Sequence, residues 1–438
     1  MTFAAQATDR ALPQGELCTA CPPVHTSPHL EGFRSRRPDA LRKVPSDRKL
    51  RSLVRDGIQV LGGVAEVRRE DWDALLDPAA TPFVRWDWIE AMERSRCASD
   101  RSGWSPRHLA LFAGGRLVAA APAWVKDDSD GDFARDWDWA GAAARAGLPY
   151  YPKLCVTVPF TPCTGRRVLV APGEDRAEAV RRIADAARAL CRRERIPSLQ
   201  VLFPLEEEAR QLGEAGLSLR MGFQFHWRNE GYRTPEDFLA RFRSKDRNAI
   251  KRERRAPSEQ GIAIRTVRGE ELSKSPREWA KAVHELHSST VRKLMWGRGW
   301  LNRAFYDLVF ERMPDALEVV EARRGSKLIA GAFNVAGANR LYGRYWGAFE
   351  EHPFLHFNVC LYHSIDECIR RGVSAFEGGA GGDHKLSRGF LPSATWSAHA
   401  FLDARLDDAM RRALEAETDD RRSALRRWSE QSPILKPA

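Results

Sequence analysis

Hydrophobic and polar positions along this chain predict a mixed α/β fold in which the same order of elements occurs twice. In each half, a strand is followed by two helices, a hairpin, a long amphipathic helix and another strand. Apolar residues in the two long helices recur at i, i+3, i+4 and i+7, the spacing of a helix that buries one face. A repeated order of elements favours a duplicated unit.

The predicted elements of the two halves correspond one to one. The first half has a strand at 58–67, helices at 71–76 and 86–96, a hairpin of 108–112 with 117–125, a long helix over 179–191 and a strand at 199–203. The second half has a strand at 262–267, helices at 276–293 and 302–313, a hairpin of 317–322 with 328–335, a long helix over 357–369 and a strand at 373–377. We therefore predict a first domain at 57–235 and a second domain at 236–438. Between the first hairpin and its long helix, Asp136-Trp137-Asp138-Trp139 alternates with a period of 2, which is typical of a strand.

Residues 1–56 carry no sustained hydrophobic period. Pro, Ser and basic residues crowd 28–55, which predicts a disordered basic tail. The tail also holds Cys18, Cys21, His25 and His29. The gap from Cys21 to His25 is shorter than the usual loop between pairs of zinc ligands, so we predict no metal site.

Composition narrows the class of protein. The chain has 438 residues and is 43% hydrophobic, enough for a large core. No apolar run approaches the ~20 residues that span a bilayer, and the start of the chain lacks the features of a secretion signal. Most of the eight cysteines fall in apolar contexts, which fits a reducing cytoplasm. The net charge of +11 indicates an anionic partner such as RNA, a phosphate-bearing cofactor or a membrane surface.

Three segments, Asp136–Pro162, Leu355–Tyr362 and Phe376–Pro392, carry a resemblance to the FemAB-like family. The order of elements also resembles GNAT acyltransferases, although neither half has the Arg/Gln-x-x-Gly-x-Gly/Ala loop that commonly binds acyl-CoA. The resemblance implies two tandem GNAT-like halves, each a mixed sheet flanked by helices. Because the better-understood Fem ligases move an amino acid from aminoacyl-tRNA onto an amine of a peptidoglycan precursor, it also implies N-acyl transfer.

The glycine-rich segment that follows the last predicted strand is the candidate active-site wall. Gly379 and Gly381, with their glycine neighbours, offer backbone N–H groups that can bind an anion. Proton transfer from the amine needs a base, and the candidates are His384, Asp383 and Glu377. The expected donor-binding residues are Lys385, Arg388, Tyr345, Trp346, His356 and Asn358, of which Asn358 stands where the family pattern has Glu.

A second feature is the run of basic residues from Arg241 to Arg255, which predicts a helix at 238–256. Clusters of this kind bind RNA phosphates without regard to sequence. The expected RNA-binding residues are Arg247, Lys251, Arg254 and Arg255. The alternative is a solvated helix that links the two halves.

These observations favour a cytoplasmic N-acyltransferase with aminoacyl-tRNA as donor, an amine as acceptor, tRNA as partner and no other cofactor. Two alternatives remain at this stage. One is an acyl-CoA-dependent N-acetyltransferase, and the other is a non-catalytic protein that binds RNA or a cell-wall precursor.

Overall fold

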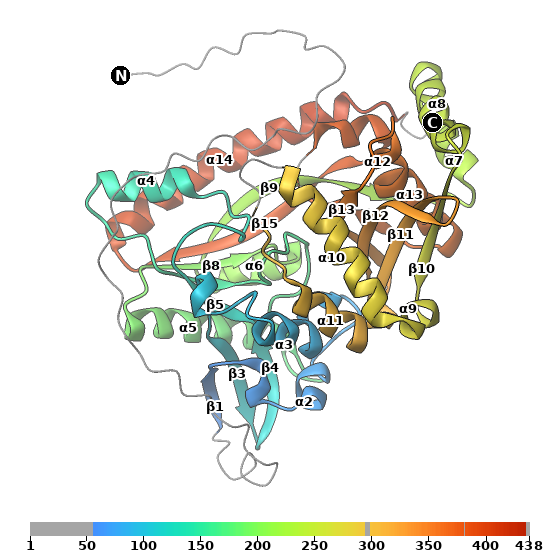
Figure 1. Ribbon diagram of the computed structural model, residues 1–438. Helices are drawn as coiled ribbons and strands as arrows, with labels where there is room; N and C mark the ends of the chain where they lie inside the picture. The colour runs from blue at the N-terminus through green and yellow to red at the C-terminus, as the bar shows by residue number, and fades with distance from the viewer. Residues whose placement is uncertain (1–55, 294–297, 381, 435–438) are drawn as a thin grey trace.

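The computed structural model describes residues 56–293, 298–380 and 382–434. The predicted tail, with its cysteine and histidine residues, lies outside them apart from residue 56. The described chain forms a small sheet and a large sheet with helices packed on their faces (Figure 1). No helix in this described part is long and apolar enough to cross a membrane.

The small sheet belongs wholly to the first half. Its strands lie in the order β1 (Gly57–Leu61), β3 (His108–Ala113), β4 (Arg116–Ala121) and β7 (Leu169–Val170). The helices α2 (Arg69–Asp73) and α3 (Trp86–Arg94) bring Trp72 and Trp88 into the core, where both are fully buried. The predicted strand at 58–67 ends at Leu61 because Gly62 and Gly63 follow and lead into a 3-10 turn.

The large sheet has eleven strands and runs through both halves. Their order is β10 (Ile262–Arg268), β11 (Leu317–Arg324), β12 (Lys327–Ala336), β13 (Arg340–Ala348), β14 (Ala375–Glu377), β9 (Ser218–Arg228), β15 (Leu391–Phe401), β8 (Ser198–Leu202), β6 (Lys153–Val156), β5 (Ala123–Lys126) and β2 (Trp104–Pro106). Most neighbours are antiparallel, whereas β13 with β14 and β6 with β8 are parallel.

The two halves exchange strands where they meet. Strand β9 of the first half pairs with β14 of the second, and β15 of the second half lies between β9 and β8. The fold is thus two tandem GNAT-like halves with the repeated order of elements, joined through one continuous sheet. The expected boundary near residue 235 therefore divides the sequence but not the sheet.

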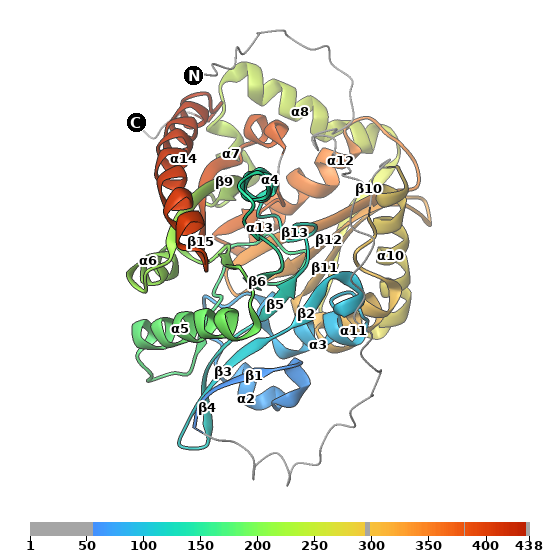
Figure 2. The same cartoon turned by 90° about the vertical axis from the view of Figure 1, so that its left-hand side faces the viewer.

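Helices cover both faces of the sheet (Figure 2). In the second half, α10 (Pro276–Lys293) and α11 (Arg303–Arg312) pack on one face. On the other face lie α8 (Ser244–Glu259), α12 (Leu355–Phe357), a π-helical turn at Asn358–Tyr362 and α13 (His363–Arg371). In the first half, the covering helices are α4 (Trp137–Arg145), α5 (Arg176–Glu194) and α6 (Glu206–Glu214), together with α14 (Ala404–Glu430) from the C-terminal end.

Three predicted elements differ in the structure. The strand at 117–125 is broken at Pro122, so that β4 and β5 join different sheets. The alternating Asp136–Trp139 stretch is not a strand, because α4 begins at Trp137. The basic helix at 238–256 is two helices, α7 (Pro235–Ala240) and α8. It breaks at Phe242, which is buried and bridges to Ile434.

Candidate active site

The parallel strands β13 and β14 separate at the glycine-rich segment. They pair from Arg340 opposite Ala375 to Tyr342 opposite Glu377. Beyond these pairs β13 continues, whereas the segment that follows β14 turns away from it. The turn needs a left-handed residue, and Gly379 has φ +83°. Next to this point β13 contains a β-bulge at Arg344, between the pairs that β12 makes with Gly343 and Tyr345. Bulges of this kind re-aim side chains and often lie beside active sites.

Three predicted residues gather on the α12 side of this opening. The ring of His356 lies 5.1 Å from that of Trp346 and 6.1 Å from that of His384, centroid to centroid. Burial, helped by the cations Lys385 and Arg388, lowers the pKa of His384 to about 4. Burial also lowers the pKa of His356 to about 4. Both imidazoles are therefore neutral at pH 7 and have a nitrogen able to accept a proton.

Lys385 closes the glycine-rich loop on itself. Its side chain is buried, and Nζ donates a hydrogen bond of 2.8 Å to the carbonyl of Gly379. The ammonium therefore lies beside the point where β13 and β14 separate. Gly381 lies outside the described residues, as does the side chain of Asp383.

Arg388 fastens the loop to α8. Its guanidinium binds the carboxylate of Glu253 through two hydrogen bonds of 2.9 and 3.1 Å and donates a third, of 2.8 Å, to the carbonyl of His384. It also lies over the ring of Phe357. Asn358 donates to the backbone carbonyl of Glu253 at 2.8 Å. These contacts favour a positioning role for Arg388 and Asn358 over the predicted contact with the donor.

Glu377 and Tyr345 point to the opposite face of the sheet. The Glu377 carboxylate is 1% exposed, receives a 2.6 Å bond from Arg340 and accepts from the backbone N–H of Thr164 at 3.1 Å. Tyr345 packs on His287 of α10 with ring centroids 4.0 Å apart. Glu377 therefore holds the first-half loop around Thr164 over the second half, and it does not share the opening with His384.

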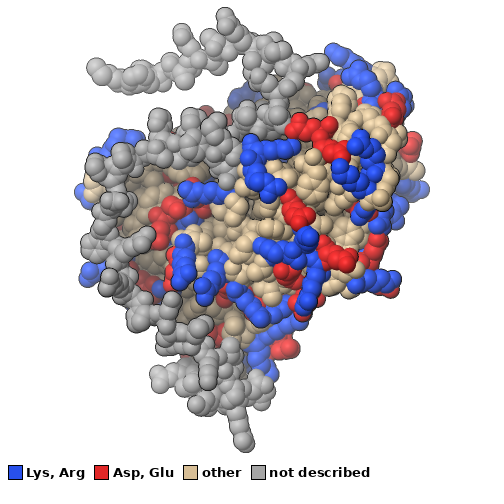
Figure 3. Space-filling model, in the orientation of Figure 1, with Lys and Arg blue, Asp and Glu red and all other residues tan. Residues whose placement is uncertain are grey.

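The structure sorts the expected RNA-binding residues into two groups. Lys251 and Arg255 are exposed, and Arg247 is partly exposed. Arg254 instead turns inward, with Nη2 2.6 Å from the carboxylate of Asp366 and its guanidinium over the ring of Tyr362. Figure 3 shows Lys and Arg side chains at the upper right, where α7 and α8 lie in Figure 1.

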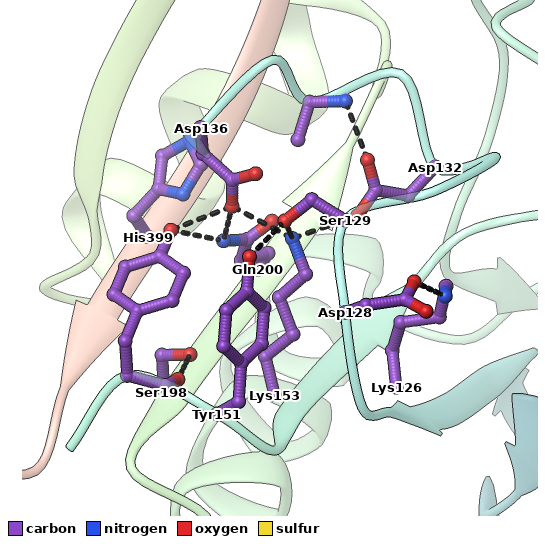
Figure 4. Close-up of polar contacts among 12 residues, drawn as sticks. Lys126, Asp128, Ser129, Asp132, Asp136, Tyr151, Lys153, Ser198, Gln200 and His399 are labelled. Atoms are coloured by element: carbon purple, nitrogen blue, oxygen red, sulfur yellow. Dashed lines mark hydrogen bonds and ion pairs between the residues drawn. The ribbon is translucent and has the colours of Figure 1, made fainter. Parts of the chain in front are cut away.

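Sequence reasoning missed a buried polar cluster in the first half (Figure 4). Lys153, at the start of β6, has Nζ within 2.7 Å of both Asp132 and Asp136 and donates to Ser129 at 2.8 Å. Gln200 of β8 donates to Asp136 at 2.6 Å. Lys153, Asp136 and Gln200 have no exposed surface. The one sequence signal was a lysine opening the apolar strand Lys153-Leu154-Cys155-Val156, since a lysine buried there needs anionic partners.

The two carboxylates of this cluster titrate differently. Burial raises the pKa of Asp132 to about 6. Burial alone would raise the pKa of Asp136 as well, but Lys153 and the hydrogen bond from Gln200 outweigh it and hold that pKa well below its usual range. Lys153 and Asp136 are consequently both charged at pH 7. The cluster ties the segment before α4 to β6 and β8.

A family model described as peptidoglycan biosynthesis/recognition, FemAB-like, matches residues 63–436. The chain belongs to the FemAB-like family.

Among solved structures, FemX has a TM-score of 0.48 at 12% identity, covering 79% of this chain and 98% of that one. L-PGS from Bacillus licheniformis has a TM-score of 0.45 at 7% identity, covering 75% and 95%. A tandem GNAT protein from the clavulanic acid biosynthesis pathway has a TM-score of 0.40 at 14% identity, covering 78% and 98%. A sequence search of curated proteins gave no match.

A carboxylate caps the long helix in the first half of this FemAB-like protein, whereas the corresponding helix of the second half starts without one. In the first half, Asp175 caps α5 by accepting from the backbone N–H of Glu178. In the second half, α12 begins after Phe354 without a side-chain cap, and Glu350 in the preceding loop pairs with Arg324 at 2.7 Å. A helix N-terminus attracts a phosphate only when its N–H groups and positive dipole are available. The N-terminus of α5 is therefore not prepared for the pyrophosphate of CoA.

Proposed function

We propose that this FemAB-like protein is an N-acyltransferase that moves an aminoacyl group from aminoacyl-tRNA to an amine, in the cytoplasm. The observation that carries the proposal is the opening between β13 and β14, where the neutral imidazole of His384 and the ammonium of Lys385 lie beside a glycine-rich backbone. Acyl transfer to an amine needs a proton acceptor, an anion-stabilising group and a positioned donor.

Each requirement has a candidate group at the opening. His384 accepts the proton of the attacking amine, because its imidazole is unprotonated at working pH. Backbone N–H groups of the glycine-rich segment, with Lys385 nearby, stabilise the oxyanion of the tetrahedral intermediate. Trp346 and His356 provide an apolar, aromatic wall against which the acyl group packs.

The choice of an RNA-borne donor rests on α8. This helix presents exposed cations at Lys245, Lys251, Arg252 and Arg255, and it is bonded to the loop of His384 through Glu253 and Arg388. RNA phosphates bound along α8 would therefore lie next to the opening. The carboxylate of Asp175 at the start of α5 argues against CoA bound at that helix, because it would repel the pyrophosphate.

The test is single-turnover transfer to an amine acceptor from labelled aminoacyl-tRNA and, separately, from labelled acyl-CoA. Aminoacyl-tRNA should support transfer, and His384→Ala should slow it by roughly 10²–10⁴-fold. His284→Ala, in a half-buried histidine of α10, is the matched control and should keep its rate. Transfer from acyl-CoA alone would overturn the donor assignment. RNA binding without transfer from either donor would identify a binding protein, and full activity in folded His384→Ala would place the base elsewhere.

A further inference from the structure

A groove of about 620 Å³ opens at the end of the large sheet that is remote from the candidate active site. Strand β15 connects the two places. It begins at Leu391, which pairs with His226 beside Glu377, and it ends at Phe401, which lines the groove. Eleven residues of strand separate them by roughly 33 Å, so the groove is not part of the opening between β13 and β14.

The floor of the groove is apolar. Leu199 at the start of β8 and Phe401 and Leu402 at the end of β15 line it. Leu402 is 41% exposed, which makes it one of few large hydrophobic side chains on the described surface that face water to this extent. A concavity of this volume, mainly apolar with a few polar groups, has the character of a small-molecule site.

The rim carries positive charge that the protein does not neutralise. Arg188, Arg192 and Arg195, from the last turns of α5, line the groove. Arg188 is held by the carbonyl of Ala215 at 2.7 Å. The side chains of Arg192 and Arg195 are exposed and form no ion pair or hydrogen bond with any residue that the structure describes.

The two acidic residues that line the groove, Asp403 and Asp407, already have partners within the protein. Asp403 caps α14 and pairs with Arg405 at 2.9 Å. Asp407 accepts from the backbone N–H of Phe401 at 3.0 Å and lies 3.5 Å from Arg411. They do not compensate Arg192 and Arg195, so the charge left to attract a ligand is positive.

Arginines at a helix C-terminus also offset the helix dipole, which is the simplest reason for their presence here. Arg193 in the same turn serves that purpose while pairing with Glu194 at 3.2 Å, and it does not line the groove. What distinguishes Arg192 and Arg195 is that they border a groove whose apolar lining includes the exposed Leu402.

We infer that this groove binds an amphipathic anion, with an apolar chain on Leu199, Phe401 and Leu402 and a phosphate or carboxylate on Arg192 and Arg195. A bare inorganic anion would leave Leu402 exposed to water, and an uncharged chain would leave both guanidinium groups unpaired. Only a ligand that has both parts satisfies the whole groove.

The experiment is calorimetric titration of the full chain with monomeric dodecyl phosphate, in parallel with dodecanoate, inorganic phosphate and dodecyl maltoside. Dodecyl phosphate should bind with one site per chain. The double variant Arg192→Gln/Arg195→Gln should weaken binding at least tenfold, and Leu402→Ser should also weaken it. Arg193→Gln is the control and should bind as the unaltered protein does. These residues are exposed, and equal thermal midpoints will show that the variants are folded.

Several results would overturn the inference. They are no binding of dodecyl phosphate or dodecanoate, equal binding by the double variant, or binding of inorganic phosphate or dodecyl maltoside as tight as that of dodecyl phosphate.

Vesicles of phosphatidylglycerol distinguish a lipid headgroup from a free amphipathic anion as the source of the ligand. Binding to vesicles that monomeric dodecyl phosphate competes away would identify a lipid headgroup, and binding to vesicles without binding of the monomer would show a general membrane surface and exclude the groove. None of these measurements depends on acyl transfer.

Discussion

Two carboxylates share one ammonium in the buried cluster around Lys153, and the protein treats them unequally. Asp136 also accepts hydrogen bonds from Tyr150 and Gln200, so its negative charge is well stabilised. Asp132 accepts, besides Lys153, a bond from the backbone N–H of Ala134. The cluster therefore has one negative charge more than Lys153 can balance. Asp132 is the carboxylate that takes up a proton to remove this excess charge.

This asymmetry predicts how stability depends on pH. Because folding raises the pKa of Asp132 to about 6, the stability that its protonated form contributes is complete below about pH 4 and is lost as the pH rises to 6. Asp132→Asn should remove that loss and raise the free energy of unfolding at pH 7 by about 1–3 kcal/mol. Asp136→Asn is the contrast, because it deprives Lys153 of its ionised partner and should cost about 3 kcal/mol. Urea unfolding between pH 4 and pH 8 measures both. A stabilised Asp136→Asn protein would reverse the assignment.

His384 supports a second prediction about a single side chain. An imidazole with a pKa near 4 stays unprotonated through neutral pH and loses its capacity as a base only as the pH falls toward 4. Titration of the acceptor amine acts equally on both proteins, so between pH 6 and 7 the rate of single-turnover transfer should depend on pH in the same way in the unaltered enzyme and in His384→Ala. The measurement is the pH profile of both proteins from pH 5 to 9. A limb near pH 6.5 that disappears in His384→Ala would mean that the imidazole is solvated when the enzyme works.

The sequence pointed to residues that border a recognisable motif and missed those that no motif marks. Trp346, His356 and His384 were predicted because each borders a recognisable loop or helix. Lys153 of β6 meets Asp136 and Asp132 of the loop before α4 and Gln200 of β8, which lie 17 to 47 residues away along the chain, and no local pattern encodes these contacts. The inward turn of Arg254 was likewise hidden, because its partner Asp366 lies in α13.

At the scale of elements, long helices with one apolar face were predicted well and short alternating stretches were not. The predicted helix at 276–293 coincides with α10. The Asp136–Trp139 alternation spans four residues, too few to distinguish a strand from the first turn of α4. The break between α7 and α8 depends on the burial of Phe242 against the C-terminal segment, a tertiary contact that charge and helix propensity do not reveal.

On helix α8, we expect the exposed basic residues to contribute to tRNA binding and the inward-facing Arg254 to contribute to stability. Replacing Lys251 and Arg255 with Gln should weaken tRNA binding and reduce its salt slope by up to about 2, since each exposed cation contributes roughly one phosphate contact. Arg254→Gln should leave the slope unchanged and lower stability, because Asp366 loses its partner. Fluorescence anisotropy across a salt series measures the slope. Arg411→Gln/Arg412→Gln on α14 removes the same charge elsewhere. If this control lowers the salt slope as much as the α8 variant does, the effect comes from net charge and not from a contact of α8 with tRNA.

At the scale of the whole molecule, the two halves form one structural unit. Strand β15 is the last strand of the second half, yet both of its neighbours, β8 and β9, belong to the first. In turn β9 covers the edge of β14 in the second half. Separating the halves would expose the backbone edges of β8, β9, β14 and β15 and uncover the apolar residues packed on them.

This interlocking predicts a single cooperative unfolding transition for the intact chain and no stable fold for either half alone. Fragments 56–235 and 236–438 should each remain unfolded or aggregate, because the first lacks β15 between β8 and β9 and the second lacks both neighbours of β15. Expressed together, the two fragments should associate and recover the far-UV circular dichroism of the intact protein. Chemical unfolding followed by circular dichroism and by tryptophan fluorescence should give coincident curves, since Trp88 lies in the first half and Trp346 in the second. Two resolved transitions, or a 236–438 fragment with native-like hydrogen exchange, would mean that the second half is stable without the strands it now shares.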